Sequence, residues 1–201
     1  MLIKNQFEVA EPLDKVWEFF GNVPQVAACL PGAELTDAPT DEHGDEHGDE
    51  TYAGTVGIRM GPVKLQFAGK AKILERDDAT KKMVIDAAGA DQKGRGQAAM
   101  VITAQLTPAG VGTKVALDQD LQLSGAAAQY GRGMISDVTT VLMGQFATNM
   151  QQRIGAIDRG ESLDGVGTSS ASGLAIGLQA ARLALMRVFR RFCLPYQPAR
   201  S

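Results

Sequence analysis

Residues 51–123 alternate between apolar and polar side chains in five consecutive runs, and this periodicity constrains the fold more than any other feature. The runs cover about 51–60, 63–75, 82–88, 96–107 and 111–123, with turn residues between them. A period of two is typical of β-strands that bury one face. Because such short connections join antiparallel neighbours, the region predicts an antiparallel sheet.

Elements on either side of these runs complete the predicted fold. Residues 2–9 alternate in the same way, and residues 33–38 predict a further short strand. Between them we expect two short helices, one after Pro12 and one over 23–29. Helical spacing over about 126–157 predicts a long helix after the last strand. This order favours an α+β fold of the helix-grip kind, a strongly curved antiparallel sheet around one long C-terminal helix.

One face of the predicted sheet is apolar, and its composition favours a pocket. Small residues interrupt this face at Gly54, Gly69, Ala71, Ala87, Ala98 and Ala104. Its polar side chains are Asn5, Thr113 and Gln119, and we expect no carboxylate or lysine on it. An apolar cavity with a few neutral hydrogen-bonding groups is typical of a small-molecule site. The alternative is that larger helix residues fill the gaps, or that the glycines serve the curvature of the sheet.

The sequence offers no recognisable catalytic constellation. Both histidines, His43 and His47, lie in the acidic stretch 41–50, where no rigid shell holds them. A nucleophile or an acid–base group needs a fixed position, so we interpret the chain as a non-catalytic accessory protein. The same stretch offers loose ligands for zinc or nickel, but a glycine-broken repeat is a poor cage, and we favour a solvated loop without metal. We interpret Cys29 as a small buried hydrophobe, with a redox or metal role as the alternative.

Charge is distributed unevenly along the chain. Five arginines and no acidic residue follow Leu174, so this end carries +5, whereas the other 15 basic residues face 23 acidic residues. Residues 158–173 are rich in Gly, Ser and Thr and predict a flexible linker. Residues 174–194 predict a basic amphipathic helix that associates with an anionic membrane surface. The alternative is a helix that packs on a partner subunit or on the chain's own domain.

The predicted membrane-binding residues lie on both faces of this helix. They are Leu178, Arg182, Leu185, Arg187, Phe189, Arg190, Arg191 and Phe192. An acidic body argues against nucleic acid as a partner. We see neither a secretory signal nor an apolar stretch long enough to span a membrane, and the two distant cysteines fit a reducing compartment. We therefore expect a cytoplasmic protein that is peripheral on the cytoplasmic face of the inner membrane.

Several short motifs resemble one known family. They are Phe7-Glu-Val, Pro12-Leu-Asp-Lys-Val-Trp17, Cys29-Leu-Pro-Gly-Ala-Glu34, Met60-Gly-Pro-Val63 and Lys93-Gly-Arg-Gly96. Over residues 1–157 the chain resembles the CoxG-like family, named for carbon monoxide dehydrogenase, of the START-like, SRPBCC polyketide-cyclase-like superfamily. The resemblance implies a helix-grip ligand-binding domain over 1–157 and an association with molybdenum-containing hydroxylases of the carbon monoxide dehydrogenase type. It does not imply catalysis.

These observations lead to one functional hypothesis and two rivals. The chain would bind a hydrophobic ligand, an isoprenoid quinone or a similar lipid with no covalent cofactor, and would link such a hydroxylase to the membrane. Asn5, Thr113 or Gln119 would hydrogen-bond the carbonyl oxygens of the ligand. The residues expected to line the pocket are Asn5, Tyr52, Phe67, Met83, Met100, Leu117, Gln119, Tyr130, Met134 and Met150. The first rival is an assembly or membrane-recruitment factor with an incidental pocket, and the second is a cyclase-like enzyme, for which a catalytic group is missing.

Overall fold

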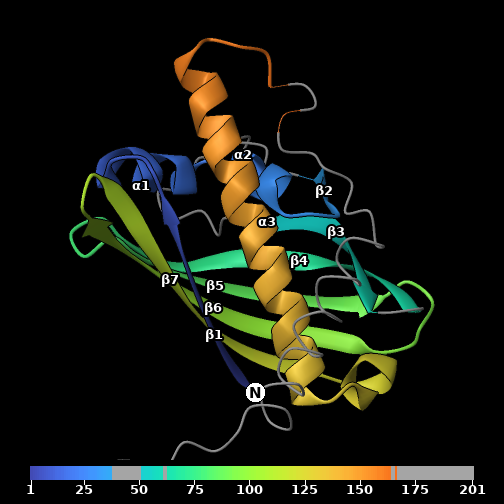
Figure 1. Ribbon diagram of the computed structural model, residues 1–201. Helices are drawn as coiled ribbons and strands as arrows, with labels where there is room; N and C mark the ends of the chain where they lie inside the picture. Colours follow the sequence, from blue (N-terminus) through green and yellow to red (C-terminus); the bar gives the residue numbers. More distant parts are fainter. Residues whose placement is uncertain (38–50, 61–62, 164–165, 167–201) are drawn as a thin grey trace, which may run out of the picture.

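The structure is a computed structural model that describes residues 1–37, 51–60, 63–163 and 166. Its elements follow one another as β1 (Leu2–Val9), α1 (Leu13–Gly21), α2 (Val23–Cys29), β2 (Ala33–Asp37), β3 (Thr51–Met60), β4 (Val63–Asp77), β5 (Lys82–Asp91), β6 (Gln97–Ala109), β7 (Gly112–Leu123), η1 (Gly125–Gln129) and α3 (Arg132–Asp158). The strands form one seven-stranded sheet, and α3 lies across its concave face (Figure 1). The short helices α1 and α2 lie at one end of this arrangement (Figure 1).

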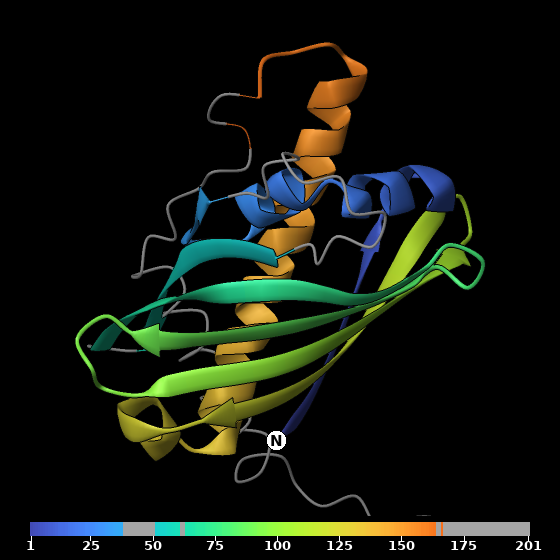
Figure 2. The same ribbon diagram turned by 180° about the vertical axis from the view of Figure 1, so that it is seen from behind.

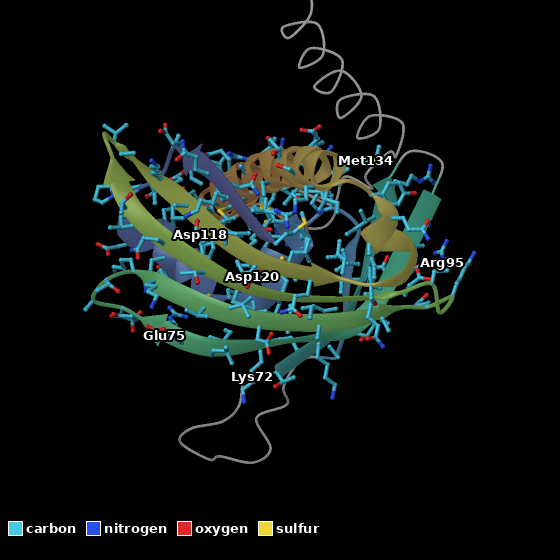
Figure 3. The ribbon with its side chains drawn as sticks, turned by 90° about the horizontal axis from the view of Figure 1, so that it is seen from below. Lys72, Glu75, Arg95, Asp118, Asp120 and Met134 are labelled. Atoms are coloured by element: carbon cyan, nitrogen blue, oxygen red, sulfur yellow. The ribbon has the colours of Figure 1, made fainter. Side chains whose placement is uncertain are left out.

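The strand order is β1-β7-β6-β5-β4-β3-β2, and every neighbouring pair is antiparallel. The first strand therefore pairs with the last, with Phe7 opposite Val115. Seen from behind, the long strands curve around the helix (Figure 2). The convex face carries charged side chains, among them Lys72, Glu75 and Asp118 (Figure 3). The predicted α+β helix-grip arrangement, with one apolar and one solvated face, is confirmed.

Two of the strand glycines allow neighbouring strands to approach closely. A Cβ atom on Gly69 would lie 2.1 Å from the carbonyl oxygen of Ala88, and one on Gly54 would lie 2.7 Å from the carbonyl oxygen of Glu34. Real Cβ atoms do not come so close to a backbone atom. These two glycines are therefore explained by the close approach of neighbouring strands and not by a pocket beside them.

The long helix begins later than its sequence periodicity predicted. The prediction of one helix from about residue 126 was wrong, because a 3₁₀ helix (η1) and a break precede α3. Gly125 has a φ of +68°, and the amide of Ala126 donates to the carbonyl oxygen of Arg95 at 2.6 Å. This contact holds the chain against the loop between β5 and β6, so the regular helix starts only at Arg132.

The chain reverses direction where α3 ends. Gly160 has a φ of +65°, and the amide of Glu161 donates to the carbonyl oxygen of Ala156 at 3.0 Å. The carbonyl oxygen of Val166 then accepts a hydrogen bond from Arg153. The rest of the predicted linker, the predicted helix over 174–194 and the acidic loop with both histidines lie outside the described residues. Within the described residues, no helix has the length and apolar character needed to span a membrane.

Candidate functional site

The interior between the sheet and α3 contains two separate clusters of buried apolar residues. The first lies against α1 and α2 and consists of Val9, Val16, Trp17, Phe19, Phe20, Cys29, Met83, Ala104, Leu106, Val115, Leu117, Phe146, Met150 and Ile154. The second consists of Leu65, Ala127 and Val138, with Ile58, Phe67, Leu123, Tyr130 and Leu142 packed against it. The helix α3 contributes to both, through Val138 in the second cluster and Phe146 in the first.

A row of half-buried residues lies between the two clusters on the concave face. It crosses five adjacent strands, and we call it the central band: Tyr52, Ala71, Ala87, Met100 and Leu121. Each of these residues keeps partial contact with solvent, and within the described part of the chain none belongs to either cluster. Within the part of the chain that the structure describes, side chains therefore cover the middle of the concave face only in part.

Among the described residues, three amide side chains, on β1, β7 and α3, have a buried atom without a hydrogen-bond partner. The atoms are Asn5 Nδ2, Gln119 Nε2 and Gln145 Oε1, and we call the three residues the amide trio. Gln119 is only 4% exposed. An unpaired buried polar atom costs on the order of 1–3 kcal/mol, so each of these atoms requires an explanation.

The trio comes from three elements that pack together. Asn5 on β1 pairs with Leu117 on β7, two residues before Gln119 on that strand. The helix α3 packs on β1, where Thr140 Oγ1 lies 3.3 Å from Asn5 Oδ1. Gln145 belongs to α3 and lies one residue before Phe146 of the first cluster.

The predicted lining residues divide among these regions. Tyr52 and Met100 belong to the central band, and Asn5 and Gln119 belong to the amide trio. The others lie in the packed clusters: Met83, Leu117 and Met150 in the first, Phe67 and Tyr130 beside the second.

Two predictions about individual residues were wrong. Met134 is 46% exposed in the first turn of α3, because the helix begins later than predicted, so it does not line the interior (Figure 3). Thr113 is buried, but its Oγ1 donates to the carbonyl oxygen of Glu11 at 2.8 Å. That hydroxyl hydrogen already has its acceptor within the fold.

A carboxylate does lie on the concave face, contrary to the sequence prediction. Asp91 ends β5, which is longer than predicted, and is 3% exposed. Its two oxygens accept from Arg95 Nε and Nη2, each at 2.8 Å, and from the amides of Gln66 and Lys93, each at 3.1 Å. These bonds, above all those from Arg95, hold the pKa of Asp91 well below its usual range. The carboxylate is therefore a poor proton acceptor and fixes the β5–β6 loop.

A shallow hollow of about 300 Å³ lies beside this loop. It is lined by Ala90, Gly94, Arg95, Gly96, Gln97, Ser124 and Gly125. Apart from Ala90, this lining offers no apolar side chain, so the hollow does not suit a hydrophobic ligand.

A second buried charge lies where α2 meets α3. Arg153 is 6% exposed, and its Nε and Nη2 donate to Gln25 Oε1 at 3.0 and 2.7 Å. Cys29 lies nearby with its thiol buried, and burial raises the pKa of the thiol to about 12. The interpretation of Cys29 as a small buried hydrophobe is confirmed. Among the described residues, no group of three His, Cys, Asp or Glu side chains is placed to hold a metal ion.

Sequence reasoning missed Gln145, Asp91 and Arg153 for one reason. Each is a polar residue inside an otherwise apolar face, and its position in the interior depends on how elements that are distant in the sequence pack around it. A partial signal existed for Asp91, since an Asp four residues before Arg95 in a Gly-rich turn is a plausible ion pair.

Comparisons with known proteins agree with this geometry. The model of the carbon monoxide dehydrogenase G-subunit (CoxG) family matches residues 6–155, a range that includes the central band, Gln119 and Gln145. No curated protein matches the sequence.

Among solved structures, a conserved protein from Geobacillus kaustophilus has a TM-score of 0.64 at 17% identity, over 77% of this chain and 95% of that one. A START superfamily protein from Mycobacterium smegmatis has a TM-score of 0.51 at 11% identity, over 78% and 98%. At these identities the likeness is one of fold, and it confirms the START-like helix-grip class.

Proposed function

We propose that this chain, which belongs to the carbon monoxide dehydrogenase G-subunit (CoxG) family, binds a hydrophobic small molecule between its sheet and α3 and does not act as an enzyme. The observation that carries the proposal is the central band, where apolar residues of five strands face α3 and remain partly accessible. Covering such a surface with an apolar ligand is favourable by about 25 cal/mol per Å².

We further propose that the ligand is an isoprenoid quinone or a similar lipid. Four spacings of about 4.8 Å between five strands give the band a length of about 19 Å, which suits an extended chain better than a compact molecule. Met100 supports this choice, because a methionine side chain repacks readily around a flexible ligand.

The family name connects the chain with carbon monoxide dehydrogenase. We propose that the ligand and the predicted helix over 174–194 together link such a molybdenum hydroxylase to the inner membrane. The enzyme must pass electrons on, and a respiratory quinone is dissolved in the bilayer. The rival function is an assembly or recruitment factor that does not use its pocket.

To test ligand binding, the full chain is purified from a cell lysate from which the membranes have not been removed beforehand. Lipid is then extracted from the purified protein and identified by mass spectrometry. We expect an isoprenoid lipid in near-stoichiometric amount. The informative variant is Ala87→Phe, which fills the central band, and its control is Ala88→Phe on the exposed face of the same strand. Loss of lipid in the first variant alone supports the proposal, whereas lipid-free wild-type protein contradicts it.

The rival function has a separate test. Carbon monoxide-dependent respiration is measured in cells that carry Ala87→Phe in place of the wild-type chain. A carrier with a filled band cannot support respiration, whereas a recruitment factor supports it at the wild-type rate.

A further inference from the structure

One end of the folded domain gathers exposed cations from β3, β4, the β5–β6 loop and the start of α3. We call these residues the basic end: Arg59, Lys64, Lys93 and Arg132. The β5–β6 loop is held beside β4, because Arg95 Nη2 donates to the carbonyl oxygen of Lys64 at 2.7 Å. The turn before α3 reaches the same loop through the bond from the amide of Ala126 to Arg95. Figure 3 shows Arg95 and Met134, which mark the loop and the first turn of α3, at the same end of the molecule.

The positions of these cations are unfavourable for the fold by itself. Arg59 is directly opposite Lys64, and both point to the convex face, since the next residue on β4, Leu65, is buried. Like charges at directly opposite positions destabilise a sheet. Arg132 is the first residue of α3, where the helix dipole disfavours a cation, and the first turn contains no acidic residue. Residues that break local rules of stability in this way are typical of functional surfaces.

Cations at the opposite end of the domain are paired with carboxylates instead. The strand β4 runs from the basic end to the turn beside α1, where Lys81 forms an ion pair with Asp14 at 3.1 Å. Lys15 on α1 forms ion pairs with acidic residues on both sides of it. Within the residues that the structure describes, the four cations of the basic end form no ion pair, and the nearby carboxylate of Asp91 is already paired with Arg95. The domain is acidic overall, but its uncompensated positive charge faces outward at one end.

The path of the chain after α3 favours a protein over a membrane as the partner of the basic end. Arg153, which holds the carbonyl oxygen of Val166, is about 32 Å beyond Arg132 along the axis of α3. The segment from Val166 to residue 174 spans at most about 28 Å. A helix over 174–194 that binds the membrane therefore starts nearer to the α1 end than to the basic end. The basic end is then free to meet a second surface, and its charge is complementary to carboxylates.

We propose that the basic end is the surface with which this chain docks onto a protein that presents a cluster of carboxylates. This inference rests on the proposed function and deepens it, because the partner is the carbon monoxide dehydrogenase to which the family name refers. Docking at this end leaves the α1 end, from which the C-terminal segment departs, directed toward the membrane. Opposite charges of this kind mainly speed the encounter and fix the orientation of the two proteins.

The test measures binding of the full chain to purified carbon monoxide dehydrogenase of the same organism by biolayer interferometry, at low and at high salt. We expect Lys64→Glu and Lys93→Glu each to weaken binding about tenfold at low salt, and high salt to reduce this difference. The control is Lys70→Glu, the same charge change on the same face of β4, about 20 Å from Lys64. At that distance salt screens the charge, so the control should leave binding almost unchanged.

Thermal melting of the same variants separates a docking role from a folding role. Lys64→Glu places a carboxylate opposite Arg59, so it should melt at or above the wild-type temperature while it binds the enzyme more weakly. Equal weakening by Lys70→Glu, or unchanged binding in both variants of the basic end, would overturn the docking surface. Weaker flotation of Lys64→Glu with anionic vesicles would assign the basic end to the membrane instead.

Lipid extraction from the same proteins distinguishes this inference from the proposed ligand. Lys64→Glu should retain lipid at the wild-type level, whereas Ala87→Phe should lose lipid and still bind the enzyme. Lipid-free wild-type protein that binds the enzyme through Lys64 would contradict the proposed ligand and support the docking surface. Failure of the wild-type chain to bind the enzyme would overturn the docking surface, whatever lipid the chain carries.

Discussion

Cys29 ends α2 with its side chain fully buried, and its Sγ lies 3.3 Å from the carbonyl oxygen of Gln25. Burial disfavours the thiolate and raises the pKa of the thiol to about 12, although the nearby charge of Arg153 opposes this shift. Because the thiolate is the reactive form, Cys29 should be inert in the folded protein at neutral pH.

We therefore expect iodoacetamide to leave Cys29 unmodified at pH 8 in the native protein and to label it rapidly in urea. The measurement is intact mass after timed labelling in a Cys193→Ser background, so that only one thiol is counted. Stoichiometric labelling of the folded protein within minutes would show that the thiol is accessible and ionisable.

The pKa of Asp91 is shifted in the opposite direction, downward, so the stability of the β5–β6 loop should change with pH in the acid range. Its folded-state pKa is depressed mainly by Arg95, so its stabilising effect is complete above the unfolded value of about 3.9 and is lost gradually as the pH falls from there through the depressed folded-state pKa. Asp91→Asn should lower the melting temperature by several degrees at pH 7 and by much less at pH 2. Asp86→Asn, on the exposed face of β5, is the control. An equal loss at both pH values would show that the charge of Asp91 does not matter.

Single residues show where sequence reasoning stops. Alternation placed Gln119 on the concave face correctly, because a strand has a fixed period. It could not show that Gln119 lacks a partner or that Asp91 has one, since both facts depend on which strands and loops meet in space. Whether a polar atom inside a core has a hydrogen-bond partner depends on tertiary contacts, and no local sequence pattern contains these.

At the scale of elements, the strands were predictable and the start of the long helix was not. The strands follow from period-two alternation and the turn residues between them. The sequence Gly125 to Gln129 has enough alanine to continue a helix, but the contact of Ala126 with Arg95 imposes a 3₁₀ turn instead. A tertiary hydrogen bond thus overrides local propensity.

This junction provides a matched pair of substitutions. Gly125 and Gly94 both have a φ of +68°, but a Cβ on Gly125 would lie 2.1 Å from the carbonyl oxygen of Arg95, whereas a Cβ on Gly94 would meet nothing within 4 Å. Gly94→Ala should cost about 1–2 kcal/mol, the conformational penalty alone. Gly125→Ala should cost about 3 kcal/mol or more, because the backbone must also move. Urea unfolding measures both, and equal losses would show that the junction is not tightly packed.

At the scale of the whole molecule, the division of the interior into two clusters is the feature that points to a ligand. Alternation assigned the apolar face correctly but could not divide it, because the division depends on how α3 crosses the sheet and which of its residues reach each strand. Phe146 and Val138 fill the two ends of the concave face, and the central band between them stays partly open. The small residues at Ala71 and Ala87 contribute to this opening, whereas Gly54 and Gly69 are explained by strand approach.

The charge distribution leads to the last prediction, about membrane binding. The five arginines after Leu174 carry all of the excess positive charge, while the remainder of the chain is acidic and is repelled by an anionic surface. Each arginine close to such a surface contributes about 1 kcal/mol, so binding should need anionic lipid and weaken in high salt. The full chain should float with vesicles of phosphatidylglycerol and phosphatidylethanolamine, and a chain truncated after Gly173 should not.

Single substitutions separate this attraction from general charge effects. Arg190→Gln should weaken vesicle binding about fivefold, the equivalent of about 1 kcal/mol, whereas Arg132→Gln at the exposed start of α3 should leave it unchanged. Equal flotation of the full and truncated chains would assign membrane contact to the folded domain. In that case the ligand would enter through a surface of the sheet or α3 that faces the bilayer. Ala87→Phe would then reduce ligand uptake equally in the full chain and in the chain truncated after Gly173.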